Sequence, residues 1–167
     1  MTQIRAEGLA AALARGVPPL VWVHGDEPLL VQEAAQVVRQ ALRAAGFAER
    51  QVFDGGRGFR PDAFVAEANA LSLFANRRLI ELRLAGKATR EIGQLLVDTA
   101  SRGSDDTRLL VCGPRLDRAT TESAWFAAVD RLALIVPIWP IERAQLPQWI
   151  GARLARQNQR ADRATLE

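Results

Sequence analysis

The sequence predicts an α/β protein built on a parallel five-stranded sheet with helices on its faces. Short apolar runs of strand length alternate along the chain with longer stretches in which apolar residues recur at helical spacing. The connections between them are short, and strands separated by helices pair in parallel through right-handed crossovers. The 167 residues, of which 49% are apolar and 25% charged, are enough for one well-buried core.

Each element follows from its own pattern. The predicted strands are residues 20–24, 51–54, 78–84, 108–112 and 132–139. The predicted helices are residues 4–14, 28–45, 61–74, 89–101 and 118–129. The second helix is the clearest, because it has a continuous apolar stripe and stops at Gly46, a residue typical of helix C-termini. That stripe consists of Leu30, Ala34, Val37, Val38, Ala41 and Leu42.

The alternation stops after Pro140. Leu146, Trp149, Ile150 and Leu154 then describe a new amphipathic helix. We therefore expect an α/β domain over residues 1–140 and the beginning of a helical domain over residues 141–167. The second part is too short to bury its own apolar face and ends inside a helical pattern without a stop signal, so we expect a fragment of a longer protein.

Charge and hydropathy limit the classes of function. The net charge is +3, and the 22 basic residues are interspersed with 19 acidic ones without any block of five like charges. No apolar run is long enough to span a membrane and the N-terminus has no signal-peptide pattern, so we expect a cytoplasmic protein without membrane contact. One row of arginines at helical spacing is a candidate nucleic-acid contact, although a solvated helix face is its more common meaning: Arg153, Arg156, Arg160 and Arg163.

The turn after the first predicted strand is where a nucleotide-binding α/β domain holds phosphate on a glycine-rich loop. When Gly25 is aligned with the first glycine of such a loop, Leu30 falls at the second glycine. Val31 then stands at the lysine and Gln32 at the magnesium-binding hydroxyl. All three chemical requirements fail, so the loop is predicted to be a degenerate phosphate loop that binds no nucleotide.

The charges of this turn support the same interpretation. Asp26 and Glu27 put carboxylates at the positive end of the next helix, where they complement the helix dipole and would repel a triphosphate. Pro28 suits the first helical turn. We therefore expect a capped helix start.

Other catalytic devices also lack their residues. His24 is the only histidine and stands at a strand end, where a structural role is more common than catalysis or metal binding. Cys112 is the only cysteine and lies in an apolar run, which is typical of a small buried hydrophobe. Glu81 and Arg83 are expected to pair with each other or with a neighbouring strand. We expect no enzyme activity, metal, cofactor or small-molecule substrate.

Leu73 and Phe74 are an apolar pair that the helical pattern turns away from the core. If residues 61–74 form one helix, Leu73 lies opposite the apolar stripe and Phe74 most of a quarter turn from it. The stripe itself is Phe64, Ala68 and Leu71. An exposed apolar pair beside polar and basic residues (Asn76, Arg77 and Arg78) has the composition of a protein-docking anchor. The alternative is that the helix ends at Ala70 and both side chains pack inward.

Several motifs together resemble the delta subunit of the bacterial DNA polymerase III clamp loader. They occur in the family's order over nearly the whole chain: WVHGDEPLL at 22–30, SLFA at 72–75, RRLIEL at 77–82, LDR at 116–118, SAWF at 123–126, IWPI at 138–141 and LPQWI at 146–150. The resemblance implies an AAA+-type domain, related to the P-loop NTPases, that binds no ATP and is followed by the start of a helical lid domain. The resemblance further implies that the family's third domain, the collar that assembles the loader, lies outside these 167 residues.

The resemblance also implies a function. The family's clamp contact corresponds here to Ser72, Leu73 and Phe74, to which we add Asn76 and Arg77 as flanking contacts. The implied partners are the sliding clamp (beta), the other loader subunits through the collar domain, and DNA in the assembled complex. The implied activity is opening of the clamp ring during DNA replication. An arginine-rich nucleic-acid-binding module is the alternative.

Overall fold

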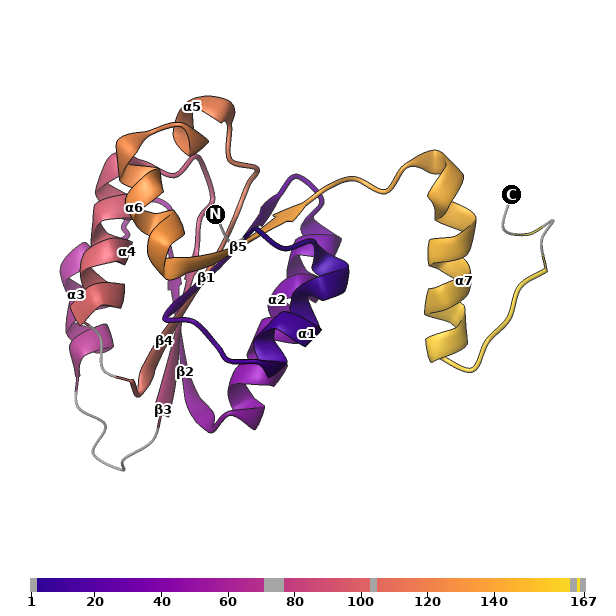
Figure 1. The fold of residues 1–167 in the computed structure, drawn as a ribbon, viewed down its shortest axis with the longest axis horizontal. Helices are drawn as coiled ribbons and strands as arrows, with labels where there is room; N and C mark the ends of the chain where they lie inside the picture. The colour runs from indigo at the N-terminus through magenta and orange to yellow at the C-terminus, as the bar shows by residue number, and fades with distance from the viewer. Residues whose placement is uncertain (1–2, 71–76, 103–104, 163–164, 166–167) are drawn as a thin grey trace.

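A single parallel sheet organises the molecule (Figure 1). The computed structural model describes residues 3–70, 77–102, 105–162 and 165. The sheet has five strands in the order β2-β3-β4-β1-β5, and every neighbouring pair is parallel. The strands are β1 Leu20–Gly25, β2 Phe47–Asp54, β3 Arg77–Arg83, β4 Thr107–Gly113 and β5 Ala133–Ile138. The predicted fold class is confirmed.

Helices cover both faces of this sheet (Figure 1). One face carries α1 Leu9–Ala14 and α2 Pro28–Ala44. The other carries α3 Pro61–Asn69, α4 Arg90–Arg102, the short α5 Arg118–Thr121 and α6 Ala124–Leu132. Two 3₁₀ turns, Ala6–Gly8 and Arg143–Gln145, precede α1 and α7. Helix α7, Leu146–Arg156, stands beyond α2 at the end of an extended connection (Figure 1).

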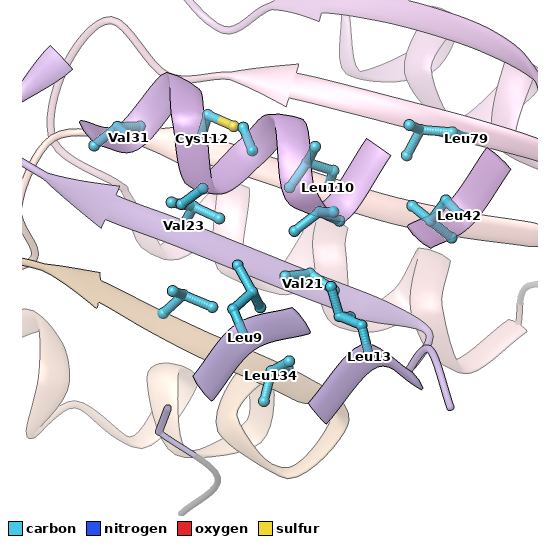
Figure 2. Packing of buried hydrophobic residues seen from close by; sticks show 14 of the residues in the cluster. Leu9, Leu13, Val21, Val23, Val31, Leu42, Leu79, Leu110, Cys112 and Leu134 are labelled. Atoms are coloured by element: carbon cyan, nitrogen blue, oxygen red, sulfur yellow. The ribbon is translucent and has the colours of Figure 1, made fainter. Parts of the chain in front are cut away.

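The core consists of two apolar layers separated by the sheet. Alternate residues of each strand point to opposite faces, so Val21 and Val23 enter one layer and Leu20 and Trp22 the other. Figure 2 shows the first layer, in which strand residues such as Leu110 meet α1 and α2. Because both faces are covered, the central strands are continuous apolar runs, which is why their pattern was readable in the sequence.

Helix α2 forms as its pattern predicts. Its buried residues are Val31, Ala34, Ala35, Val38 and Leu42, and Leu30, Val37 and Ala41 pack partly buried against them. Gly46 has φ of 92°, a left-handed conformation that suits glycine after a helix.

Besides the helix predicted over residues 61–74, which ends at Asn69, three predicted elements differ clearly in the structure. The chain at Ile4 pairs with β5, because the Ile4 N–H donates to the Ile135 carbonyl, and the 3₁₀ turn Ala6–Gly8 follows; the predicted helix over residues 4–14 therefore becomes α-helical only at Leu9. The predicted helix over residues 118–129 is interrupted at Ser123, whose hydroxyl accepts from the Phe126 N–H and starts α6. Strand β2 begins at Phe47, earlier than predicted. The prediction missed this start because β2 lies at the edge of the sheet and its polar residues do not show a strand pattern.

Candidate functional site

The predicted clamp contact lies only partly within the described residues. Ser72, Leu73, Phe74 and Asn76 fall outside them, and Arg77 is the one member that the structure describes. Helix α3 ends at Asn69, and Ala70 is already extended at φ −63° and ψ 130°. The prediction of one helix through Phe74 is therefore wrong, and the helical winding that turned Leu73 away from the core has no basis in the structure.

Helix α3 precedes the predicted clamp contact and strand β3 follows it. Phe64 and Ala68 of α3 are buried, as their predicted stripe requires. Phe64 lies in edge contact with Phe53, with 5.3 Å between ring centroids, so the helix is packed onto β2. The end of α3 and the start of β3 lie at the same end of the sheet (Figure 1).

Arg77 opens strand β3 and remains half exposed. One of its terminal nitrogens donates to the Ala45 carbonyl at 3.2 Å, and Nε lies 3.5 Å from an Asp106 carboxylate oxygen. Its guanidinium carbon lies 5.5 Å from the centre of the Phe47 ring. These contacts hold Arg77 at the surface beside the end of α2, with part of its charge available to a partner.

The opposite end of the sheet contains the degenerate phosphate loop. A Cβ on Gly25 would lie 2.5 Å from the Ile138 carbonyl oxygen, so glycine is required there by the closeness of β5. Val31, at the lysine position, is buried in the core. Leu30 packs partly buried beside it, and Gln32 is exposed and lies within reach of Arg39. Gly25, Leu30 and Val31 therefore contribute to the packing of β5 and α2 against the sheet.

The capping prediction for this turn is wrong in one respect. Glu27 occupies the N-cap of α2 without a side-chain hydrogen bond, and Pro28 lies in the first turn as predicted. The Asp26 carboxylate instead accepts from the Arg115 N–H at 3.2 Å, which ties the loop to the segment after β4. This contact joins positions 89 residues apart and could not be read from local spacing.

His24 stands beside this loop and is buried. Its Nδ1 accepts from the Leu116 N–H at 3.3 Å. Burial, helped by the positive charge of Arg115, lowers the pKa of His24 to about 4. The imidazole is therefore neutral near pH 7 and works as a hydrogen-bond acceptor between β1 and the segment after β4.

Glu81 lies in the middle of β3 at the centre of an ionic cluster. Its carboxylate is fully buried and accepts from Arg39 of α2 at 2.9 and 3.0 Å, from Arg50 of β2 at 2.9 Å and from Arg83 at 2.9 Å. Burial alone would raise the pKa of Glu81, but the hydrogen bonds from Arg39, Arg83 and Arg50 outweigh it and lower the pKa to about 2. The predicted pairing with Arg83 and with a neighbouring strand is confirmed, whereas the contact from α2 was missed.

Cys112 lies near this cluster on β4. Its side chain is buried, and burial together with the negative charge of Glu81 raises the pKa of the thiol to about 12. A thiol that stays protonated is a poor nucleophile and metal ligand. Within the described part of the chain, no group of three or more His, Cys, Asp or Glu side chains could hold a metal ion.

A groove of about 650 Å³ separates α2 from α7. Arg153 reaches across it to pair with Glu33 of α2, and its guanidinium carbon lies 3.9 Å from the centre of the Trp149 ring. Helix α7 ends at Arg156, so Arg160 lies beyond the helix, and Arg163 falls outside the described residues. The predicted arginine row is therefore not one helix face, which removes the structural support for a nucleic-acid-binding module.

We compared the sequence with models of known protein families. The family model described as "DNA polymerase III, delta subunit" matches residues 22–138. This chain belongs to the DNA polymerase III delta subunit family. The resemblance predicted from the sequence motifs is confirmed, and the matched range contains both the degenerate phosphate loop and the predicted clamp contact.

Individual relatives agree with this assignment. DNA polymerase III subunit delta of Escherichia coli (strain K12) is 33% identical over 165 residues, which are 98% of this chain and 48% of the relative. The Haemophilus influenzae subunit delta is 20% identical over 170 residues, with 100% and 49% of the two chains covered. The chain thus spans about half the length of the curated relatives it matches.

A solved structure supports the fold. The Bacillus subtilis DNA clamp loader delta protein superposes with a TM-score of 0.65 over 92% of this chain and 48% of that one, at 18% sequence identity. This likeness supports the α/β fold described above. In the described ranges, no helix is both long and apolar enough to cross a membrane.

Proposed function

We propose that this chain is the clamp-contacting part of a clamp-loader delta subunit, which binds the ring-shaped beta sliding clamp and opens it for loading onto primed DNA during replication. The observation that carries the proposal is the family match over residues 22–138. That range contains Ser72, Leu73 and Phe74, the positions at which the resemblance puts the clamp contact, with Asn76 and Arg77 beside them.

The chemistry of the contact is burial of an apolar pair. Transfer of one leucine and one phenylalanine side chain from water into an apolar pocket contributes roughly 3 to 6 kcal/mol before the costs of association. If that pocket is more accessible in the open ring, binding shifts the clamp toward opening, because a ligand moves an equilibrium by its difference in affinity for the two states. Opening then requires no catalysis by this chain.

The same proposal assigns roles to the parts of the chain. Residues 1–140 form the clamp-binding α/β domain, and residues 141–167 begin a helical lid domain. The chain acts as a non-catalytic accessory subunit in the cytoplasm. Contacts with the other loader subunits and with DNA belong to the assembled loader. The buried Val31 and the Asp26 to Arg115 contact support a domain that works without bound nucleotide.

The test is the double variant Leu73→Ala with Phe74→Ala. We expect its affinity for an immobilised beta clamp, measured by surface plasmon resonance, to fall at least about a hundredfold, since a central apolar anchor carries most of such a contact. Circular dichroism should give an unchanged fold.

Leu29→Ala with Trp139→Ala is a matched control. These are the two exposed large apolar residues of the described chain, at 55% and 54% exposure. They follow the carboxyl ends of β1 and β5, whereas β3 begins at the other end of the parallel sheet. The control variant should bind the clamp like the unmodified chain. Undiminished clamp affinity in the Leu73, Phe74 double variant would refute the site assignment.

A further inference from the structure

Helix α7 is not packed into either apolar layer of the core. It follows an extended connection after β5 and stands across the groove from α2 (Figure 1). All eleven residues of α7 are described and none of them is buried, whereas α2 buries five side chains against the sheet. Because little apolar surface fixes α7 in place, its orientation depends on specific contacts.

An ion pair crosses the groove between the two helices. Nη2 of Arg153 on α7 donates to the Glu33 carboxylate on α2, and the two residues are 120 positions apart in the sequence. Both side chains are partly shielded from water, at 30% and 43% exposure, so salt screens their attraction less than that of a fully exposed pair. The pair therefore ties α7 directly to α2.

Trp149 orders the arginine of this pair. It lies one helical turn before Arg153, on the same face of α7, and the guanidinium carbon is 3.9 Å from the centre of its ring. A guanidinium stacked on an indole keeps its charge and its N–H groups free to point elsewhere. Since a long side chain loses rotamer freedom when it forms an ion pair, this ordering reduces the entropic cost of bonding to Glu33.

Glu33 is the carboxylate of the groove to which Arg153 donates. Four other charged residues line the groove: Arg5, Glu7, Glu142 and Arg156. Nε of Arg153 is buried and has no hydrogen-bond partner among the described residues, so no bond from Nε compensates for the loss of Glu33. Removing the Glu33 charge is therefore a direct test of what the pair does.

We propose that the ion pair of Glu33 and Arg153 selects the orientation of α7 against α2, and thereby sets the direction of the chain that follows the α/β domain. An ion pair of this kind is weak beside an apolar core, so it favours one orientation without locking it. When the pair opens, α7 turns about the extended residues 139–142. The inference goes beyond the proposed function and involves no clamp contact.

The experiment measures the distance between α2 and α7 by double electron–electron resonance. Spin labels are attached to Gln40→Cys and Ala155→Cys, at two exposed positions, while Cys112 stays unlabelled because it is buried and the pKa of its thiol is raised to about 12. The labelled chain should give one dominant distance. Glu33→Gln, which removes the charge and nearly keeps the shape, should lower the ratio of this population to the others about two- to fivefold.

Glu7→Gln is the matched control, because it removes a carboxylate from the same groove and leaves the ion pair in place. It should not change the distances. Glu33→Arg, which sets two guanidiniums against each other, should broaden the distribution more than Glu33→Gln does. Adding Arg153→Glu restores opposite charges and should narrow it again, although the stack on Trp149 is lost. Urea unfolding midpoints should agree across the series, since no buried side chain is changed.

Each other outcome decides against the inference. A broad distribution in the labelled chain with its pair intact, or distances unchanged by Glu33→Gln and Glu33→Arg, would show that the pair does not set the orientation. Equal broadening by Glu7→Gln would assign the effect to the general charge of the groove. A Glu33→Arg distribution that Arg153→Glu fails to narrow would exclude the pairing as its cause. These distances are measured without the clamp, so a failure of the proposed function is a separate result.

Discussion

Replacing Glu81 by glutamine tests the ionic cluster at the centre of the sheet. Glutamine has nearly the shape of a protonated glutamate, so Glu81→Gln removes the negative charge and leaves the arginines in place. The pKa of Glu81 falls from its ordinary 4.5 to about 2 in the folded state. At about 1.36 kcal/mol per tenfold change in proton affinity, the ionised carboxylate contributes about 3 kcal/mol to folding at pH 7.

The sign of the pH dependence follows from the direction of the pKa change. Because folding lowers this pKa, the contribution is fully present above pH 4.5 and is lost as the pH falls toward 2. Glu81→Gln should therefore reduce the free energy of unfolding by about 3 kcal/mol at pH 7, and by about half as much at pH 3. The variant itself lacks this part of the acid dependence.

Urea unfolding at both pH values measures the difference. Glu122→Gln is the control, because Glu122 forms an exposed pair with Arg118 on one helical turn, and such pairs contribute less than about 1 kcal/mol. A loss below about 0.5 kcal/mol in Glu81→Gln at pH 7 would refute the reasoning. A loss that stays constant between pH 7 and pH 3 would show that the charge is not its source.

Three further predictions concern packing, nucleotide binding and protonation. Gly93→Ala should destabilise the fold by about 1 to 3 kcal/mol in urea unfolding, although alanine is the better helix former, because the alanine Cβ would collide with the Trp125 ring. Gly86→Ala is the control, since a Cβ there meets nothing within 4 Å, and equal stability of the two variants would contradict the prediction. Titration calorimetry with magnesium and ATP should give no binding, since Leu30, Val31 and Gln32 replace the phosphate-binding residues, and micromolar magnesium-dependent binding would overturn the expectation. The NMR signals of His24 should titrate near pH 4, and the free energy of unfolding should fall as the pH drops below 6.5 because protonation is disfavoured in the fold; a midpoint above 6 would disprove its burial as a neutral acceptor.

Local patterns predicted most of the fold because the central strands are buried on both faces. Strand β1 and helix α2 differ from their predicted bounds by one residue at one end, and strand β4 by one residue at each end. The start of β2 was missed because β2 lies at the edge of the sheet, where most of its residues are at least partly exposed and do not need to be apolar. The break at Ser123 did have a local signal, because serine is a preferred N-cap.

The end of α3 has no clear stop signal in the sequence. Asparagine is favoured just beyond a helix end, but Asn69 is the last helical residue of α3 and is followed by an extended Ala70. An apolar stripe cannot show where a helix stops, since residues beyond the end continue to fall at apparent helical angles. The assignment of Leu73 and Phe74 to the clamp contact consequently depends on the family motif, because α3 ends before these residues.

The contacts that sequence could not supply are those between distant segments. Arg39 and Glu81 are 42 residues apart, and the Asp26 and Arg115 contact spans 89 residues. Nothing in the spacing of charged residues along the chain selects one pairing over another. Only the crossovers of the sheet bring these groups together, so their pKa values and roles depend on the fold.

The phosphate-loop positions show why nucleotide binding could not be restored by one substitution. Lysine at position 31 would place its stem in the apolar core beneath α2, where Val31 is buried, and an ammonium there would be desolvated. Any side chain at position 25 would collide with the end of β5, and Asp26 is held by the segment after β4. Positions 25, 26 and 31 each make a contact that stabilises the fold, so a phosphate-binding loop would require all three contacts to change together. The described residues on either side of the proposed clamp contact, at the end of α3 and the start of β3, lie at the other end of the same sheet (Figure 1). There Arg77 donates to the Ala45 carbonyl and Arg78 to the Glu67 carbonyl, and neither contact involves the loop. The clamp binding proposed for residues 72–77 therefore does not require nucleotide at the loop after β1.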